Sequence, residues 1–208
     1  FNANGATGYR SEPIIARDEN GVPLDQEARA TNDQRSFRLG MEHSLTTNQG
    51  LFVQYDRSQN DGRGQGVGGF NLPERATSSS RESNQLRFRL QGLVGTASLN
   101  ELRVQLNHNT SENWSASSGR AIIVQDYFSR GGAGVNSRNK IESFEIADNF
   151  DFNVGTRHQM RVGLQLEGDN YSNFDERNKA GTYTFTTLEN FLGGMPVQYS
   201  ERRGTLHT

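Results

Sequence analysis

The sequence has no cysteine among its 208 residues and few apolar ones, at 32%. The missing thiols exclude disulfide frameworks, thiolate zinc sites, iron–sulfur clusters and cysteine nucleophiles. Counting glycine and leaving out tyrosine, as composition surveys do, brings the apolar share to roughly 40%, below the 45–50% of an ordinary globular domain. Such a composition indicates either partial disorder or a fold that needs apolar residues on one thin surface only.

The chain also lacks an excess of charge and a long hydrophobic run. It has 22 basic and 24 acidic residues, for a formal net charge of −2, so no global field attracts nucleic acid, which is not an expected partner. The longest aliphatic run covers residues 121–124, far short of the roughly 20 residues of a membrane-spanning helix. Because the chain begins without methionine, we expect it to be a piece of a longer protein.

What the sequence does contain is a two-residue alternation of apolar and polar side chains. It occurs in six segments, at residues 35–45, 51–56, 85–91, 102–107, 144–152 and 159–167. This period is typical of strands with two unlike faces. With their flanks the segments are about 9–12 residues long, enough to cross a bilayer at a tilt.

The connections between these segments alternate in length. Residues 46–50, 95–100 and 153–157 form short connections, whereas residues 59–82, 110–139 and 170–196 form long polar ones. Short turns on one side and long loops on the other are typical of bacterial outer-membrane barrels, with the loops outside the cell. We therefore expect an all-β, antiparallel, up-and-down transmembrane β-barrel segment of about six to seven strands, which is too few to close such a barrel.

In this interpretation the apolar positions face lipid and the polar positions face the barrel interior. The lipid-facing positions are Phe37, Leu39, Met41, Val53, Tyr55, Leu86, Phe88, Leu90, Leu102, Val104, Leu106, Phe144, Ile146, Phe150, Met160, Val162, Leu164 and Leu166. The lumen-facing positions are Arg38, Glu42, Asp56, Arg87, Arg89, Arg103, Glu145, Arg161 and Glu167, whose mixed signs predict cross-strand ion pairs. Asp148 falls between Ile146 and Phe150, where either a β-bulge or a place near the periplasmic head groups would accommodate it.

Three further segments carry weaker signals. Residues 1–34 show no period and are expected to be an extracellular loop or an irregular lead-in to a barrel domain at 35–208. The glycine-rich loops at 61–69 and 130–137 are expected to pack little. Residues 186–194 predict a short helix with Thr186 and Glu189 as its capping box, and residues 196–203 predict the start of a seventh strand.

Two stretches resemble the barrel of TonB-dependent outer-membrane receptors, in particular the Oar-like branch. They are the strand–turn–strand EIADNFDF…RHQMRVGLQLEG at 145–168 and the segment GTYTFTTLENFLGGMP at 181–196 with the following Tyr199. The resemblance covers about residues 35–208. It implies a 22-stranded barrel with an internal plug, energised by the TonB complex through that plug, which this stretch omits. The expected partners are thus the lipid bilayer, the TonB complex and an extracellular solute of unknown identity.

No residue pattern points to catalysis, a metal or a cofactor, so we expect a protein that is not an enzyme. Residues 64–69 match G-x-G-x-x-G literally, but no helix follows to receive a phosphate. His43, His108 and His158 fall on the lipid-facing parity near strand ends, where an amphipathic ring suits the membrane interface.

Two other functional classes share parts of this pattern. A soluble or surface-attached β-sandwich, such as an adhesin or carbohydrate-binding module, would bury its apolar parity against a second sheet. A porin-like or structural barrel would differ only in having no plug.

Overall fold

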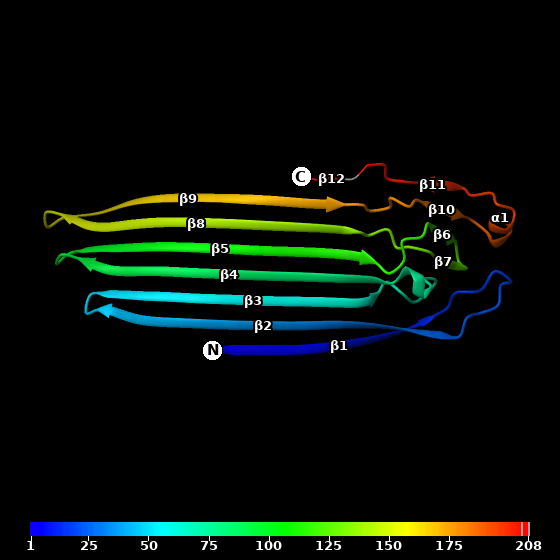
Figure 1. Cartoon of the computed structure of the whole chain (residues 1–208), viewed down its shortest axis with the longest axis horizontal. Coiled ribbons are helices and arrows are strands. Elements are labelled where there is room, and N and C mark those ends of the chain that lie inside the picture. Colours follow the sequence, from blue (N-terminus) through cyan, green and yellow to red (C-terminus); the bar gives the residue numbers. More distant parts are fainter. Residues whose placement is uncertain (205, 208) are drawn as a thin grey trace.

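The chain forms one large antiparallel sheet in the computed structural model, which describes residues 1–204, 206 and 207 (Figure 1). The strand order is β1-β2-β3-β4-β5-β8-β9-β12. Its members are β1 (Asn2–Ile14), β2 (Gln26–Thr46), β3 (Gln49–Gln65), β4 (Thr77–Val94), β5 (Ser98–Ser115), β8 (Ser137–Val154), β9 (His158–Asp175) and the two-residue β12 (Leu206–His207). The sheet is open, with β1 and β12 at its edges, so the predicted all-β, incomplete barrel segment is confirmed.

All three tight hairpin turns lie at one end of the sheet, and the long connections lie at the other (Figure 1). Residues 47–48, 95–97 and 155–157 join β2 to β3, β4 to β5 and β8 to β9. Gly95 and Gly155 have φ of 68° and 65°, which only glycine adopts without strain. The predicted alternation of short and long connections is therefore confirmed.

The strands extend well past the alternating segments that predicted them. β4, β5, β8 and β9 have 18 residues each and β2 has 21, which at about 3.4 Å per residue gives strands near 60 Å long. The loops are correspondingly shorter than expected, at residues 66–76 between β3 and β4 and 116–136 between β5 and β8. Backbone hydrogen bonding between the strands continues into regions where the side chains on both faces are polar. Such regions show no alternation of hydropathy, so the sequence pattern does not mark them as strands.

The expectation of an irregular segment at residues 1–34 is wrong for most of its length. β1 pairs with β2 in continuous register from Asn2 opposite Arg38 to Ile14 opposite Gln26. All of β1 lies beside the polar, loop-side half of β2. It therefore has no apolar alternation to show, and only residues 15–25 form a connection.

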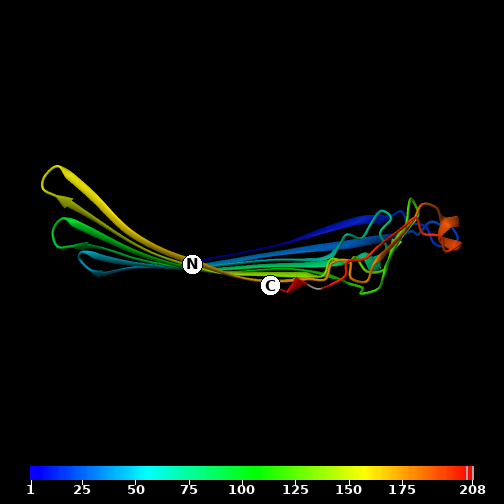
Figure 2. The same ribbon diagram turned by 90° about the horizontal axis from the view of Figure 1, so that it is seen from above.

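The large sheet is a single layer (Figure 2). Seen from above, the strands run as one thin curved wall, and the hairpin ends fan apart on the side away from the loops (Figure 2). Within the described residues no second sheet covers the apolar parity, and Leu164 on β9 is 80% exposed. The packing that a β-sandwich requires is absent from this part of the chain.

The long connections fold together into a small cap at the loop end. Its four-stranded sheet has the order β11-β10-β6-β7, formed by β6 (Ala121–Val124), β7 (Phe128–Arg130), β10 (Thr182–Phe185) and β11 (Gln198–Ser200). The 3₁₀ turn η1 (Pro73–Arg75) and the helix α1 (Leu188–Leu192) complete it. Ile14, Ala16, Ala28, Val124, Phe128 and Phe185 form its buried core.

The cap corrects two predictions about the loops. The glycine-rich connection at 61–69 is packed: Ile15 N–H donates to Gly69 O at 2.8 Å, and Gly69 N–H donates to Pro13 O at 3.0 Å. The residues predicted to start a seventh strand form β11, which pairs with β10 in the cap sheet and not with β9. The first error arises because Pro13 and Ile15 are distant from Gly69 in the sequence, and the second because alternation does not specify which neighbouring strand a segment pairs with.

The predicted short helix is present, with a different cap. α1 has Thr187 at its N-cap, where the hydroxyl accepts from Asn190 N–H at 3.1 Å. Thr186 accepts instead from the Asn190 side chain at 2.9 Å. Within the described residues, no helix is long and apolar enough to cross a membrane.

Candidate functional site: the two faces of the sheet and the cap

The register places every predicted lipid-facing residue on one face of the sheet. Directly opposed residues of neighbouring strands point to the same side. One such row is Met41, Val53, Phe88, Val104, Ile146 and Leu166, and the row beside it is Leu39, Tyr55, Leu86, Leu106, Phe144 and Gly168. The predicted lumen-facing residues all have the opposite parity and lie on the other face. We call these the apolar face and the polar face.

The apolar face has a defined height. On β8 its apolar side chains run from Val154 to Phe144, interrupted by Asp148, which is ten residues or about 34 Å along the strand. The next row toward the loops is polar from β3 to β9, with Arg57, Asn84, His108, Glu142 and Asn170. At the strand tilt of about 35–45° that membrane barrels have, this length spans about 24–28 Å, close to their roughly 25 Å apolar band.

Asp148 lies inside this band without a β-bulge. The pairing of β8 with β5 and with β9 is continuous through Asp148. Its carboxylate accepts a hydrogen bond from Asn100 Nδ2 at 2.7 Å. Both explanations offered by the sequence are therefore wrong, because the pairing has no bulge and apolar rows lie on both sides of Asp148, toward the turns as well as toward the loops.

A row of polar side chains crosses the polar face from β2 to β8, and we call it the polar belt. Asp56 accepts from Arg38 Nε at 2.5 Å and from Arg87 Nη2 at 3.2 Å. Arg87 Nε donates to Gln85 Oε1 at 2.9 Å. Gln85 Nε2 donates to Asn107 Oδ1 at 2.9 Å, and Asn107 Nδ2 donates to Ser143 Oγ at 3.1 Å. Five strands are thus cross-linked by one chain of hydrogen bonds.

The other predicted lumen-facing residues lie outside the belt. Arg161 pairs with Asp151 across β9 and β8 at 2.6 and 2.8 Å, and Arg103 is 3.4 Å from Glu101 on its own strand. The Arg89 guanidinium lies 5.2 Å from the centroid of the Phe52 ring. The predicted cross-strand ion pairs are confirmed for Asp56 and Arg161. Glu42 and Glu145 share the polar face but are not brought into the belt.

The sequence analysis missed the neutral members of the belt. Gln85, Asn107 and Ser143 were not singled out, because an uncharged polar residue on a strand carries no distinctive signal. The available clue was parity, since all three fall on the polar parity at successive register positions. Beside the belt lies a polar hollow of about 480 Å³ lined by Asn2, Asn4, Ser36, Phe37, Arg38, Asp56, Arg57, Ser58, Ser83, Gln85, Arg87, Asn107 and Asn109.

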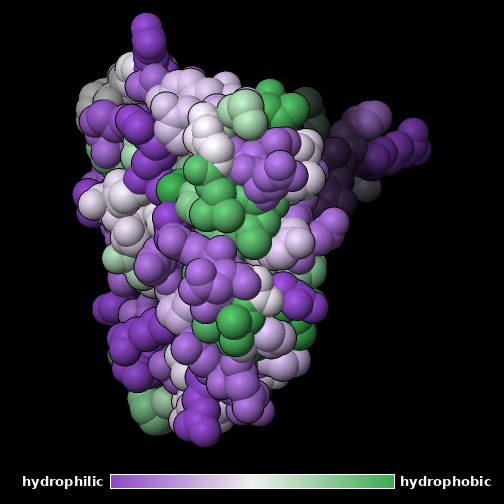
Figure 3. Space-filling model, turned by 90° about the vertical axis from the view of Figure 1, so that its right-hand side faces the viewer, coloured by the Kyte–Doolittle hydropathy of each residue, from purple (hydrophilic) through white to green (hydrophobic). Residues whose placement is uncertain are grey.

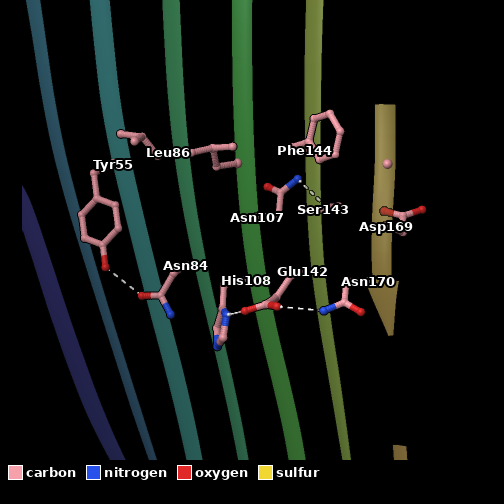
Figure 4. Close-up of a pocket in the computed structure, with 12 residues that line it drawn as sticks. Tyr55, Asn84, Leu86, Asn107, His108, Glu142, Ser143, Phe144, Asp169 and Asn170 are labelled. Carbon is pink, nitrogen blue, oxygen red and sulfur yellow. Dashed lines mark hydrogen bonds and ion pairs between the residues drawn. The ribbon is translucent and has the colours of Figure 1, made fainter. Parts of the chain in front are cut away.

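A second hollow lies where the apolar band ends, and Figure 4 shows its residues. It has a volume of about 510 Å³ and is lined by Tyr55, Asn84, Leu86, Leu106, Asn107, His108, Glu142, Ser143, Phe144, Gly168, Asp169 and Asn170. Most of these have the parity of the apolar face, so the hollow opens on that side. We call it the border hollow.

An ion-pair cluster ties the end of β9 to the chain that returns from the cap. Asp175 is 4% exposed and accepts from Arg177 Nη2 and from Arg202 Nη1, each at 2.6 Å. These hydrogen bonds, with Arg177 contributing most, hold the pKa of Asp175 far below its ordinary value. Folding of this end of the sheet therefore favours the ionised form of the carboxylate.

The tip of the cap presents apolar side chains to solvent. Figure 3 views the molecule from this end and shows hydrophobic groups among hydrophilic ones. Leu192, Met195 and Val197, at the end of α1 and before β11, are 65%, 60% and 63% exposed. The buried Phe128 and Phe185 hold α1 in place through edge-to-face contacts with Phe191, at 5.4 and 5.3 Å between ring centroids.

The open, up-and-down sheet with an apolar face, a polar face and hairpin turns at one end has the architecture of a wall segment of a β-barrel. A search of solved structures agrees: the crystal structure of the outer membrane transporter YddB from Escherichia coli matches 99% of this chain with a TM-score of 0.64 and 10% sequence identity. This chain spans 28% of the length of that transporter. No protein-family model and no curated protein matches the sequence. The fold is therefore that of an open segment of a β-barrel wall.

Proposed function

We propose that this chain is part of the barrel wall of an outer-membrane transporter that binds and imports an extracellular solute. The observation that carries the proposal is the segregation of the two faces. An apolar band about 34 Å long along the strand lies on one face with nothing packed over it, in the part of the chain that the structure describes. In water such a surface would aggregate, whereas in a bilayer it is solvated by hydrocarbon.

The polar face supports the second half of the proposal. The belt of guanidinium, carboxylate, amide and hydroxyl groups is suited to a water-filled lumen, since each group has a hydrogen-bond partner and an open side. Its polar hollow offers amide and hydroxyl groups to a polar solute. We therefore assign the polar face to the lumen, and the cap to the cell exterior, where its exposed tip meets the solute first.

The TonB-dependent mechanism rests on the sequence resemblance. In this scheme the cap captures the solute, and the TonB complex then moves a plug that lies outside this chain to open the lumen. No residue of this chain carries out chemistry in the scheme. The wall contributes solvation, charge and shape.

Accessibility measurements on adjacent residues test the membrane assignment. Val104 and Gln105 are neighbours on β5 with opposite parity, and the chain has no cysteine of its own. A spin label at Val104→Cys in the full-length protein in vesicles is expected to collide with oxygen, and one at Gln105→Cys with a water-soluble nickel chelate. Equal accessibility of the two labels to the chelate would contradict the proposal.

Import is tested separately with cells that carry the intact gene. Depletion of solutes from the growth medium is compared in cells with and without the protein, each with and without the TonB complex. We expect a solute whose depletion requires both. Depletion that persists without the TonB complex would exclude the energised mechanism, and no depletion at all would favour a structural barrel.

A further inference from the structure

The polar face has almost no charge on the loop side of the polar belt. The central register row of this region contains Gln34, Asn60, Arg81, Ser111 and Asn139, on β2, β3, β4, β5 and β8. The rows on either side of it begin on β2 at Ser36 and at Asn32, and across the same five strands they contain no aspartate, glutamate, lysine or arginine. Arg81 is therefore a single cation surrounded by amide and hydroxyl groups.

The Arg81 guanidinium is free to pair with a ligand. Among the described residues no carboxylate forms an ion pair with it, and the residue is exposed. The adjacent Glu82 points to the opposite face, where its carboxylate lies 3.3 Å from Arg57 Nη2. The five N–H donors of Arg81 are thus left to water. An anion could bind here without breaking an ion pair of the protein.

A hollow of about 300 Å³ surrounds this guanidinium, and Arg81 lines it together with its neighbours in the central row. We call it the arginine hollow. It adjoins the polar hollow beside the belt, because Ser58, Ser83 and Asn109 line both. The two hollows form one polar surface that leads from the loop side of the wall to the belt.

The neutral groups of this surface are suited to the hydroxyl groups of a sugar. The side chains of Ser83 and Asn109 make no hydrogen bond in the part of the chain that the structure describes. Hydroxyl and amide groups both donate and accept, as a sugar hydroxyl does. Ile141 and Tyr171 continue the row of Asn109, and the 58% exposed Tyr171 offers an aromatic surface to the C–H groups of a sugar ring.

The charges along this surface favour an anionic solute. A guanidinium presents two parallel N–H groups that match the two oxygens of a carboxylate. In the belt, the next charged groups toward the turns, Arg38 and Arg87 share the single carboxylate of Asp56. The path from Arg81 to the belt is therefore positive on balance, and it attracts anions and repels cations.

We infer that the arginine hollow binds an acidic oligosaccharide of the uronic-acid type. A carboxylate of the solute pairs with Arg81, and its hydroxyl groups bond to the surrounding amides and hydroxyls. The inference rests on the proposed function, since it requires the polar face to be open to solute from the loop side. It names the class of solute that the transporter would bind.

Calorimetric titration of the full-length protein with two matched probes tests the site. The probes are a trimer of galacturonic acid and its methyl ester, which has the same ring hydroxyls and no charge. The wild type is expected to bind the acid more tightly than the ester. Arg81→Gln should weaken binding of the acid about tenfold, as expected for loss of one charge-assisted hydrogen bond, and should leave binding of the ester unchanged.

Arg35→Gln is the matched control. Arg35 is also exposed, and it lies on the neighbouring β2 with the parity of the opposite face. Its replacement should leave the affinity for both probes unchanged. Equal binding of acid and ester by the wild type, binding of neither, or equal effects of the two substitutions would overturn the inference.

Denaturant unfolding of the same variants identifies a competing partner for Arg81. The site requires Arg81→Gln to unfold at the wild-type midpoint. A lower midpoint, together with no preference for the acid in the wild type, would show that a carboxylate elsewhere in the longer protein pairs with Arg81 and would overturn the inference. Acid-selective binding that depends on Arg81, in a protein whose cells deplete no solute, would support the site and contradict the proposed import.

Discussion

Phe88→Arg is the substitution that most directly tests the apolar face. Phe88 lies between one and two rows from the middle of the apolar band, and its cross-strand partners are Val53 and Val104. Its diagonal neighbours Leu51, Tyr55, Leu102 and Leu106 include no carboxylate that could pair with an arginine. A guanidinium at this position must therefore be solvated by hydrocarbon or reach along the strand to water.

The expected cost is about 2–4 kcal/mol, the penalty for arginine near the midplane on the lipid face of a barrel. It corresponds to a roughly 30- to 1,000-fold smaller ratio of folded to unfolded protein. The assay is denaturant unfolding of the full-length protein in vesicles, followed by the shift in electrophoretic mobility between folded and heat-unfolded barrel.

Gln105→Arg is the control. Gln105 lies on the polar face opposite Arg87 and Glu145, so a further guanidinium there is solvated by water and should change the stability by less than about 0.5 kcal/mol. The assignment of the apolar face to lipid would be refuted if Phe88→Arg unfolded at the same denaturant midpoint as the wild type. It would also be refuted if both variants lost the same free energy of unfolding.

Three further predictions concern the belt and the cap. Asp56→Asn leaves the half-exposed Arg38 and Arg87 without their carboxylate and should lower the unfolding free energy by about 1 kcal/mol, measured as above. The pKa of Asp175 is lowered in the folded state, so its contribution is complete above its ordinary pKa and is lost as the pH falls below about 4. The protection factors of the amides at the end of β9, which correct for the intrinsic pH dependence of exchange, should therefore fall on acidification in the wild type and be low at every pH in Asp175→Asn; identical profiles would contradict the role of this ion pair. Phe128 is 1% exposed in the cap core, and Phe128→Ala should lower the free energy of unfolding of the cap by about 3–5 kcal/mol. Proteolysis of the cap with an unchanged barrel mobility shift is the expected readout, and a protease-resistant cap would show that the core does not hold it.

The sequence alone determined the parity of the strands inside the apolar band. Alternation is imposed wherever one face of a strand must be apolar and the other polar, so Phe88 and Arg87 could be assigned to opposite faces without coordinates. The positions of the hairpin turns could also be predicted from the sequence, because the turns are short and join segments that are adjacent in the sequence. The helix at 188–192 was found for the same local reason, although its N-cap was displaced by one residue.

The tertiary structure decided what lies beyond the band. β1 and the loop-side halves of the other strands carry polar residues on both faces, so no period marks them, and only pairing with a neighbouring strand shows that they are extended. The cap brings together Ile14, Val124 and Phe185 from three distant connections, and no local pattern specifies which apolar residues of separate loops will meet. The polar belt and the border hollow likewise depend on register across several strands. The hydropathy of a side chain depends on whether it faces an apolar or an aqueous environment, and this can be seen in the sequence. Which distant segments pair or pack together depends on the tertiary structure.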